Sequence, residues 1–472
     1  MSKINQQDNY KNNFGYCLRS SSIFFIPPEP VKTSFILSDY WKFKNNLEVV
    51  LIANFRNMDG SLVKREKIKF IDKIVVELEC PLGLFGSCEI EAFSNQDLKI
   101  PYSAIMAVYE SQESISMVHS YSRVYSRLEI EDEKIIVDGK EGCWTLRDDN
   151  NVESFAVLHN GFSTLKEQEI QITVRNYKGE KRSLKFRLKE LKPYETYLVY
   201  PNLYFENLTE FLDGQEGSAS INFLLETSFT RLLVCWQTKN KKEMQVTHSN
   251  FNYSLHETDL IDCEYKYGHM VIPYFEDSKD LYAMVYPEKH PGNYIVSSHN
   301  IKPKYISENL EIFKVNNQNL KFERQDGKLP SRIVTALKIA SKKKSVLPCE
   351  CSLGIFHKNR PEKKFHWGIY SQKFKSKIII TAIADIYGKP KNTNLCLRIY
   401  SQKTTSIIEL NLNWDQISKD EVNASIDLLK YYKKSNIDFD NFMYFSIFSH
   451  YGGFFIYTTS EKGDSISLEH SF

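Results

Sequence analysis

The sequence predicts an all-β protein made of three tandem, duplicated β-sandwich units of immunoglobulin- or fibronectin-like architecture, with a mixed insertion between the second and third. The composition favours strands, because 28 Tyr and 30 Phe among 472 residues suit a pleated, half-buried surface. Short segments of alternating apolar and polar residues are bounded by Gly, Asn and Pro, as in antiparallel sandwiches. We place the units at 14–127, 140–254 and 349–472, and the insertion at 255–348.

A recurring turn supports the assignment of three units. In each unit an alternating strand ends in Asn or Asp, two further residues and Gly, which predicts a strand entering a hairpin. The three turns lie at 57–60, 176–179 and 385–388. Their spacing is that of whole domains rather than of solenoid repeats.

A recurring strand end is the second shared feature. Each unit has an alternating strand that ends in His-Ser, and the histidines are His119, His248 and His470. Side chains two residues apart lie on one face of a strand, so each histidine continues the apolar row before it. We therefore expect the three histidines to occupy equivalent positions in three copies of one module.

Two helices are expected outside this strand pattern. The first ends the insertion, where Pro330 and Ser331 suit a helix start and apolar residues recur at 333, 337 and 340. The second lies in the third unit, where Ser418 and Glu421 form a capping-box pair before apolar residues at 422, 426 and 429. The start of the insertion, 263–299, is strand-like and could be a degraded fourth unit.

Charge and cysteine content limit the compartment and the partners. The 61 basic and 59 acidic residues give a net charge of +2, which removes the usual reason to expect nucleic-acid or anionic-membrane binding. No secretory signal and no apolar run of membrane-spanning length is visible, so we predict a cytoplasmic protein without a transmembrane segment. Nine cysteines without C-x2-C spacing favour reduced thiols, and we expect no cofactor and no metal.

Candidate chemistry rests on histidine placement, because phosphate-loop, nucleophile-elbow and H-E-x-x-H motifs are missing from the sequence and no catalytic residue can be assigned. His159 and His366 each begin a His-x-Gly sequence whose glycine lies 18 or 20 residues before a turn glycine, so we expect the two histidines at equivalent places. The expected neighbours are His159 with His248, His366 with His470, and Asp39 with His119.

Such neighbours have two interpretations. Two imidazoles and a carboxylate would suit zinc or iron, and one imidazole could act as a general base. The favoured interpretation is that each histidine closes a core at a strand end, with one ring nitrogen bonded to a loop carbonyl. Trp41 and Trp367, near loop positions, are candidates to contact a sugar ring or a partner protein.

Two functions follow from these observations. The first is a non-enzymatic tandem β-sandwich protein, binding or structural, whose partner is a protein or a carbohydrate. The alternative is an enzyme acting on a sugar or polar metabolite, with loop histidines as base or metal ligands. Closure of the three units around a pseudo-threefold axis, or a homo-oligomer, would bring His119, His248 and His470 together, whereas a linear string would separate them.

Overall fold

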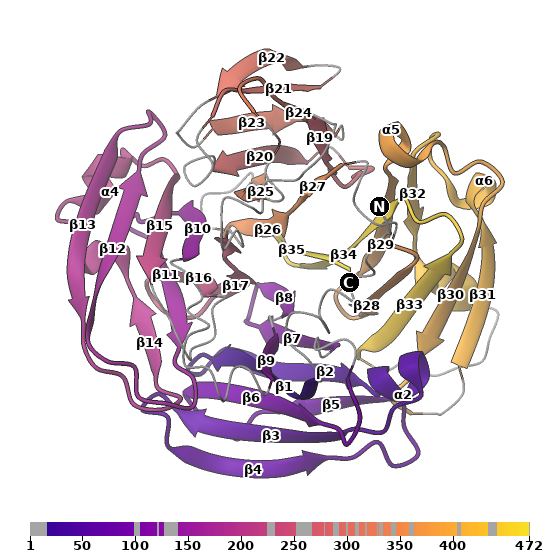
Figure 1. Cartoon of the computed structure of the whole chain (residues 1–472), viewed down its shortest axis with the longest axis horizontal. Helices are drawn as coiled ribbons and strands as arrows, with labels where there is room; N and C mark the ends of the chain where they lie inside the picture. The colour runs from indigo at the N-terminus through magenta and orange to yellow at the C-terminus, as the bar shows by residue number, and fades with distance from the viewer. Residues whose placement is uncertain are drawn as a thin grey trace.

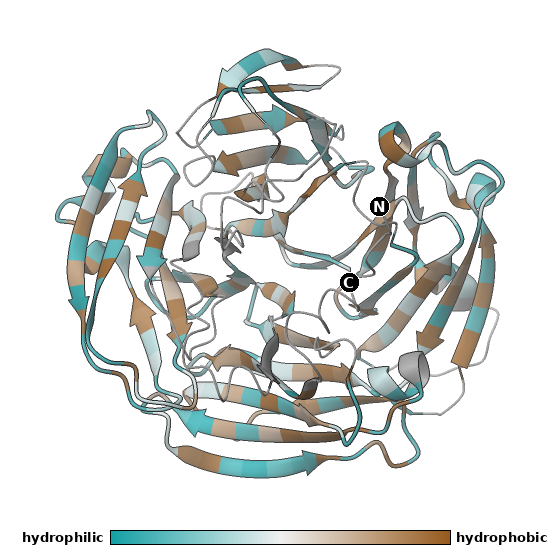
Figure 2. Ribbon diagram, viewed as in Figure 1, coloured by the Kyte–Doolittle hydropathy of each residue, from teal (hydrophilic) through white to brown (hydrophobic). Residues whose placement is uncertain are grey.

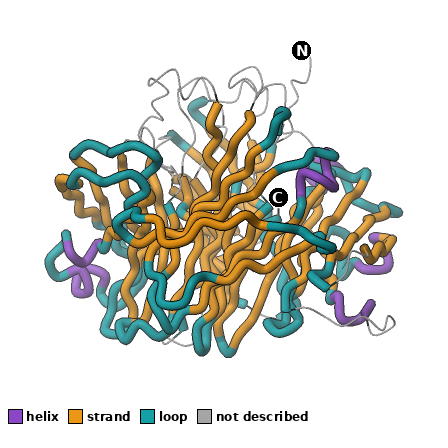
Figure 3. The backbone as a smooth tube through the Cα atoms, turned by 90° about the horizontal axis from the view of Figure 1, so that it is seen from below, coloured by secondary structure: helices purple, strands orange, loops and turns teal. Residues whose placement is uncertain are grey.

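The computed structural model of the chain shows strands throughout. It describes residues 17–98, 104–119, 122–126, 140–223, 232–251, 267–277, 279–286, 292–298, 301–306, 311–316, 319–327, 329, 334–340, 346–357, 363–403, 407–432 and 441–471. These residues form eight antiparallel sheets of four or five strands, which confirms the predicted all-β sandwich class (Figure 1). The few helices are short and peripheral (Figure 3), and no helix in the described part of the chain could cross a bilayer.

The first two sheets come from one continuous stretch of chain, unit 1. One sheet has the order β4-β3-β6-β1-β9 and the other β5-β2-β7-β8. The strands are β1 (Cys17–Ile26), β2 (Lys32–Ser38), β3 (Val50–Asn57), β4 (Leu62–Ile68), β5 (Val75–Glu79), β6 (Gly86–Phe93), β7 (Ile105–Glu110), β8 (Ile115–His119) and β9 (Ser122–Ser126), with helix α2 (Tyr40–Asn45) after β2.

Unit 2 repeats this layout. Its sheets are β13-β12-β15-β10-β18 and β14-β11-β16-β17. The elements are β10 (Lys140–Leu146), β11 (Val152–His159), β12 (Gln168–Arg175), β13 (Lys181–Leu188), β14 (Thr196–Val199), η1 (Pro201–Leu203), α4 (Leu208–Leu212), β15 (Gly217–Phe223), β16 (Leu233–Thr238), β17 (Met244–His248) and β18 (Asn250–Phe251).

Unit 3 falls largely in the segment that the sequence pattern assigned to an insertion. Its sheets are β22-β21-β24-β19-β27 and β23-β20-β25-β26. The strands are β19 (Tyr267–Met270), β20 (Asp280–Tyr286), β21 (Tyr294–Ser298), β22 (Ile301–Ile306), β23 (Glu311–Val315), β24 (Leu320–Arg324), β25 (Val334–Ala340), β26 (Cys349–Leu353) and β27 (Ile355–Phe356). The expected insertion at 255–348 thus carries two sheets of its own, and these sheets also take β26 and β27 from the segment beginning at 349.

Unit 4 completes the described chain with sheets β28-β33-β30-β31 and β32-β29-β34-β35. Its elements are β28 (Phe365–Tyr370), β29 (Lys377–Ala382), α5 (Ala384–Tyr387), β30 (Asn394–Tyr400), β31 (Ile407–Asn413), α6 (Trp414–Ile417), β32 (Asn423–Ile426), α7 (Leu428–Tyr432), β33 (Met443–Ser449), β34 (Phe454–Lys462) and β35 (Ser465–His470).

One strand order recurs in all four units. Adding nine to the strand numbers of unit 1 gives both sheets of unit 2, and adding nine again gives both sheets of unit 3; unit 4 follows the same order without a counterpart of β9. We call the sheets that end in β8, β17, β26 and β35 the hub sheets, and their partners the flank sheets. Each hub and flank sheet of a unit enclose an apolar core, as in a sandwich.

The four units form a closed ring in which all eight sheets stack face to face (Figure 1). The flank sheet of each unit packs on the hub sheet of the next, and the flank sheet of unit 4 packs on unit 1. The contacts that join successive units include Phe25 to Phe155 (ring centroids 6.2 Å apart), Thr145 N to Glu350 Oε2 (2.8 Å), Phe356 to Phe455 (5.1 Å) and Tyr40 to Phe365 (6.3 Å). Radial stacking of this kind also leaves few free sheet edges.

The stacking explains the hydropathy of the hub strands. Each hub sheet is covered by its own sandwich core on one face and by the neighbouring unit on the other. In β16, for example, Val234 and Trp236 face the unit 2 core, whereas Leu233 and Cys235 belong to the apolar cluster shared with unit 1. Apolar side chains therefore cover both faces of such strands, while the outermost strands β4 and β13 carry hydrophilic stretches (Figure 2).

This double burial explains why the first helix prediction was wrong. Residues 334–340 form β25, in which Val334 and Ala336 face unit 2 while Leu337 and Ile339 face the unit 3 core. A strand that is apolar on both faces mimics helical spacing. Pro330 and Ser331 lie outside the described residues.

The second predicted helix is also replaced. Helix α6 ends at Ile417, before Ser418, and its N-terminal cap is Asn413, whose side chain accepts a hydrogen bond from Asp415 N. Residues 423–426 form β32, which pairs with β29. Val422 precedes this strand, Ile426 ends it and Leu429 lies in the short helix α7, so the apolar spacing after Ser418 runs over two elements rather than along one helix.

The turn in the last predicted unit is out of register with the other two. Gly60 and Gly179 follow the flank strands β3 and β12 and have φ of +83°, which favours glycine. The segment before Gly388 is instead the hub strand β29, and Gly388 ends helix α5. The turn at 385–388 therefore resembles the other two in sequence but follows a strand of the other sheet.

The contact between unit 4 and unit 1 should carry much of the ring's stability. Trp367 is 5% exposed, stacks on Tyr444 at 5.4 Å, and belongs to the same apolar cluster as Trp41 of unit 1. We expect Trp367→Ala to lower the free energy of unfolding by about 3–5 kcal/mol, measured by urea denaturation. Leu203→Ala, at a residue 76% exposed, is the control and should change it by less than about 0.5 kcal/mol. Equal effects of the two changes would contradict the closed ring.

Candidate metal centre

The innermost strands of the four hub sheets meet on the axis of the ring. These strands, β8, β17, β26 and β35, lie in a cycle in which each contacts the next. They are joined by side chains rather than by a sheet ladder: Val246 N donates to Ser116 Oγ (3.0 Å) and Met117 N donates to Ser467 Oγ (2.9 Å). The axis is thus a hydrogen-bonded hub built from all four units.

The register of three hub sheets places the last histidine of the axial strand on the face that is turned towards the preceding unit. His119 pairs with Met106, His248 with Leu233, and His470 with Tyr457. The last residue of β26 in unit 3, Leu353, pairs with Thr335, which lies on the same strand face as Leu337 and Ile339. Residues directly opposite in an antiparallel pair share a face, so the three histidines point away from their own sandwich cores, whereas Leu353 points towards the core of unit 3.

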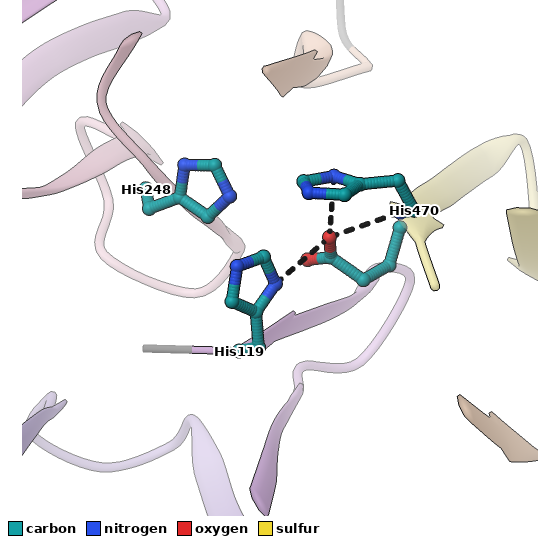
Figure 4. Close-up of side chains that lie close together, drawn as sticks. His119, His248 and His470 are labelled. Atoms are coloured by element: carbon teal, nitrogen blue, oxygen red, sulfur yellow. Dashed lines mark hydrogen bonds and ion pairs between the residues drawn. The ribbon is translucent and has the colours of Figure 1, made fainter. Parts of the chain in front are cut away.

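The three histidine rings consequently face one another (Figure 4). Their centroids are 4.6 Å apart for His119 and His248, 5.0 Å for His119 and His470, and 5.8 Å for His248 and His470. All three side chains are buried or nearly so. Imidazoles from units 1, 2 and 4 therefore lie in one cluster at the axis of the ring.

The cluster also contains a carboxylate, which the recurring sequence pattern had not indicated. Glu469 is 3% exposed, and its Oε1 lies 3.0 Å from His119 Nδ1 and 3.1 Å from His470 Nδ1. The backbone N–H of His470 also donates to this oxygen, at 3.0 Å. The ligand atoms of the three histidines and Glu469 all lie within 4.8 Å of one another.

The signal for Glu469 was present in the strand pattern. The register places it opposite Thr458, at a position that Val118 occupies in β8 and Thr247 in β17. An acidic residue beside a strand-end histidine, where the other copies have an uncharged residue, indicates a buried ionic partner. Glu469 has no acidic counterpart at these positions of β8 and β17, so recurrence along the chain does not reveal it.

Two further contacts define the surroundings of the cluster. Cys351 Sγ lies 3.7 Å from His470 Nδ1, and burial raises the pKa of this thiol well above its ordinary value, which keeps it neutral. His248 Nδ1 lies 3.2 Å from the carbonyl oxygen of Ser249. With Nδ1 donating to that carbonyl, Nε2 of His248 carries the free electron pair.

The other predicted histidines lie elsewhere. His159 Nδ1 hydrogen-bonds Thr196 Oγ1 at 2.9 Å, and His366 Nδ1 hydrogen-bonds Ser471 Oγ at 3.0 Å. His366 thus adjoins the residue after His470, but neither histidine belongs to the four-residue group. Their positions are also not equivalent, because His159 ends the hub strand β11 whereas His366 lies in the flank strand β28.

The remaining candidates are part of the packing between units. Trp41 is 1% exposed and Trp367 is 5% exposed, and both belong to the apolar cluster between unit 1 and unit 4. Asp39 precedes helix α2, and burial is the main cause that raises the pKa of its carboxyl above the ordinary value. Asp39 is not a member of the histidine cluster.

A cavity among the described residues lies away from the histidine cluster. This cavity has a volume of about 330 Å³ and lies at the outer turns of unit 2, lined by residues that include Asn176, Lys178, Arg182 and Phe211, and no histidine in the described part of the chain lines it.

Comparison with protein-family models gave no match, and no curated protein proved similar in sequence.

Burial of His159 generates a pH prediction. Burial lowers the pKa of His159 to about 3, below the ordinary value of 6.5. Between these two pH values the imidazole is protonated in the unfolded chain and neutral in the folded chain. Stability should fall as the pH drops from about 6.5 towards 3, by roughly 1.4 kcal/mol per unit. His159→Gln should reduce this slope in urea titrations at several pH values. If the free energy of unfolding changed with pH equally in the variant and the wild type, the conclusion that burial keeps His159 neutral would be contradicted.

Proposed function

We propose that this protein is a non-enzymatic structural and binding protein, a rigid closed ring whose outer surface carries a partner protein. The observation that supports this most is the contact between flank and hub sheets, which recurs at every junction and also joins unit 4 to unit 1. Apolar interfaces of this kind hold the units in one rigid body, so that the units do not move independently.

The outer rim is the part of the ring available to partners. The strands β4, β13, β22 and β31 each end a flank sheet. Most residues of β4, β13 and β22 are exposed, and exposed residues alternate with half-buried ones along most of β31. Exposed apolar side chains lie on them, including Leu62 (51% exposed) and Tyr305 (71% exposed). Charged residues such as Lys64 and Lys304 separate these side chains and protect open edges from aggregation.

A protein partner is better supported than a carbohydrate. The carbohydrate hypothesis relied on Trp41 and Trp367 as stacking surfaces, and both are buried between units. The enzyme alternative is weakened in the same way, since the clustered histidines are buried and a general base must reach its substrate. A cytoplasmic location is part of the proposal, and the seven free thiols among the described residues support it.

The ring should unfold as one cooperative body. In differential scanning calorimetry we expect a single transition whose calorimetric and van't Hoff enthalpies agree, because each hub sheet loses one covered face if a neighbour unfolds. Trp367→Ala should lower the midpoint temperature without splitting the peak. Two or more separate transitions in the wild-type protein would contradict a rigid scaffold.

Partner binding should depend on the rim. In size-exclusion chromatography of extracts from cells that make the protein, we expect the wild-type chain to elute in an assembly larger than its own mass of 55.2 kDa. The double variant Leu62→Ser and Tyr305→Ser should move most of the protein to the mass of the free chain, because it removes exposed apolar contacts. Leu203→Ser, at an exposed residue outside the rim strands, should leave the assembly intact. Elution of the wild-type protein only at the mass of the free chain would contradict the binding role.

A further inference from the structure

We infer that the axial cluster is a metal site in which His119, His248, His470 and Glu469 bind one divalent transition-metal ion, with Zn²⁺ as the best match. Three imidazole nitrogens and one carboxylate oxygen form a four-ligand set of the type that zinc takes. The inference stands apart from the scaffold proposal, because a metal-free ring could still bind a partner.

The distances are close to those of a tetrahedral site. With bonds of about 2.0–2.2 Å, the ligand atoms of tetrahedral zinc lie roughly 3.3 Å apart. Glu469 Oε1 is already 3.0 Å from His119 Nδ1 and 3.1 Å from His470 Nδ1, and the four ligand atoms lie within 4.8 Å of one another. Small movements of the imidazole rings towards the axis would complete the coordination of the ion.

The electrostatics also call for a cation. A carboxylate that is 3% exposed is costly unless positive charge lies beside it. The histidines supply that charge in one of two ways, by holding a proton or by sharing a metal ion with Glu469. Zn²⁺ would compensate the carboxylate and would use the imidazoles in their neutral form, which is the form that buried histidines prefer.

The outer contacts of the ligands fit a metal site as well. A metal-binding histidine commonly donates its second ring N–H to a carbonyl, which fixes the tautomer. His248 meets this condition, because Nδ1 contacts the carbonyl oxygen of Ser249 at 3.2 Å and leaves Nε2 for the axis. The backbone N–H of His470 holds Glu469 Oε1 in place at 3.0 Å.

The position of the site gives the ion a structural role. Its ligands come from units 1, 2 and 4. One bound ion would therefore tie together three units whose ligands are far apart in the sequence. A cross-link that closes such long loops opposes opening of the ring.

Metal content is the first test. The full chain, purified from cells grown with added Zn²⁺, should retain about one zinc per chain by mass spectrometry of the metal. His119→Gln and Glu469→Gln should each lower the retained zinc at least about ten-fold. His450→Gln, at an exposed histidine outside the cluster, is the control and should leave the content unchanged. Circular dichroism of each variant reports whether it has folded.

Two measurements on the wild-type protein need no variant. Refolding with Co²⁺ in place of Zn²⁺ should give the intense visible absorption of tetrahedral cobalt, and refolding with a chelator should lower the melting temperature by several degrees relative to refolding with Zn²⁺.

Wild-type protein that holds no zinc after growth and refolding with Zn²⁺ would overturn the inference. So would a melting temperature that responds to pH but not to Zn²⁺ or chelator, because the cluster would then share a proton instead of a metal. Cooperative unfolding and partner binding could both persist in that case, so failure of the metal site is distinguishable from failure of the scaffold role.

Discussion

The structure depends on one packing constraint: every hub sheet must be covered on both faces. Its own flank sheet covers one face, and only a neighbouring unit can cover the other. Apolar clusters that cross unit boundaries provide this second covering. A single unit would expose one broad apolar sheet to water, so the units are interdependent even though each has its own core.

The same constraint determines what happens at the axis. Four sheets that approach a common line bring their last strands together, and those strands must satisfy their backbone groups without a ladder partner on the inner side. Serine side chains such as Ser116 and Ser467 accept the free N–H groups of neighbouring strands. At the ends of these strands His119, His248 and His470 lie beside one another, and His119 and His470 contact the carboxylate of Glu469.

Much of this architecture could be predicted from the sequence. The strand content, the sandwich class and the matching strand ends of His119, His248 and His470 all follow from period-two alternation, because burial of one strand face is a local property. The unit spanning 267–356 could not be recognised as an equal member, because it lacks both the His-Ser end and the turn glycine in the expected place. Strands such as β25 were misassigned because burial on two faces removes the alternation.

The site itself was only partly predictable. Recurrence in the sequence identified the three histidines, but their convergence depends on ring closure, which is a property of the interfaces and leaves no local pattern. Glu469 occurs once and therefore carries no repeat signal. His159 and His366 shared a local motif but lie on strands of different sheets, which shows that similar spacing without equal topology misleads.

The junction between unit 4 and unit 1 is of the same kind as the three junctions along the chain, and this similarity has a consequence for assembly. A head-to-tail surface closes on itself only if the rotation per unit returns to the start. At high concentration, a molecule whose fourth unit detached before closure would present the surface that another copy needs. Two chains could then exchange their fourth units, and longer series of such exchanges would give open polymers from the same contacts that make the monomer.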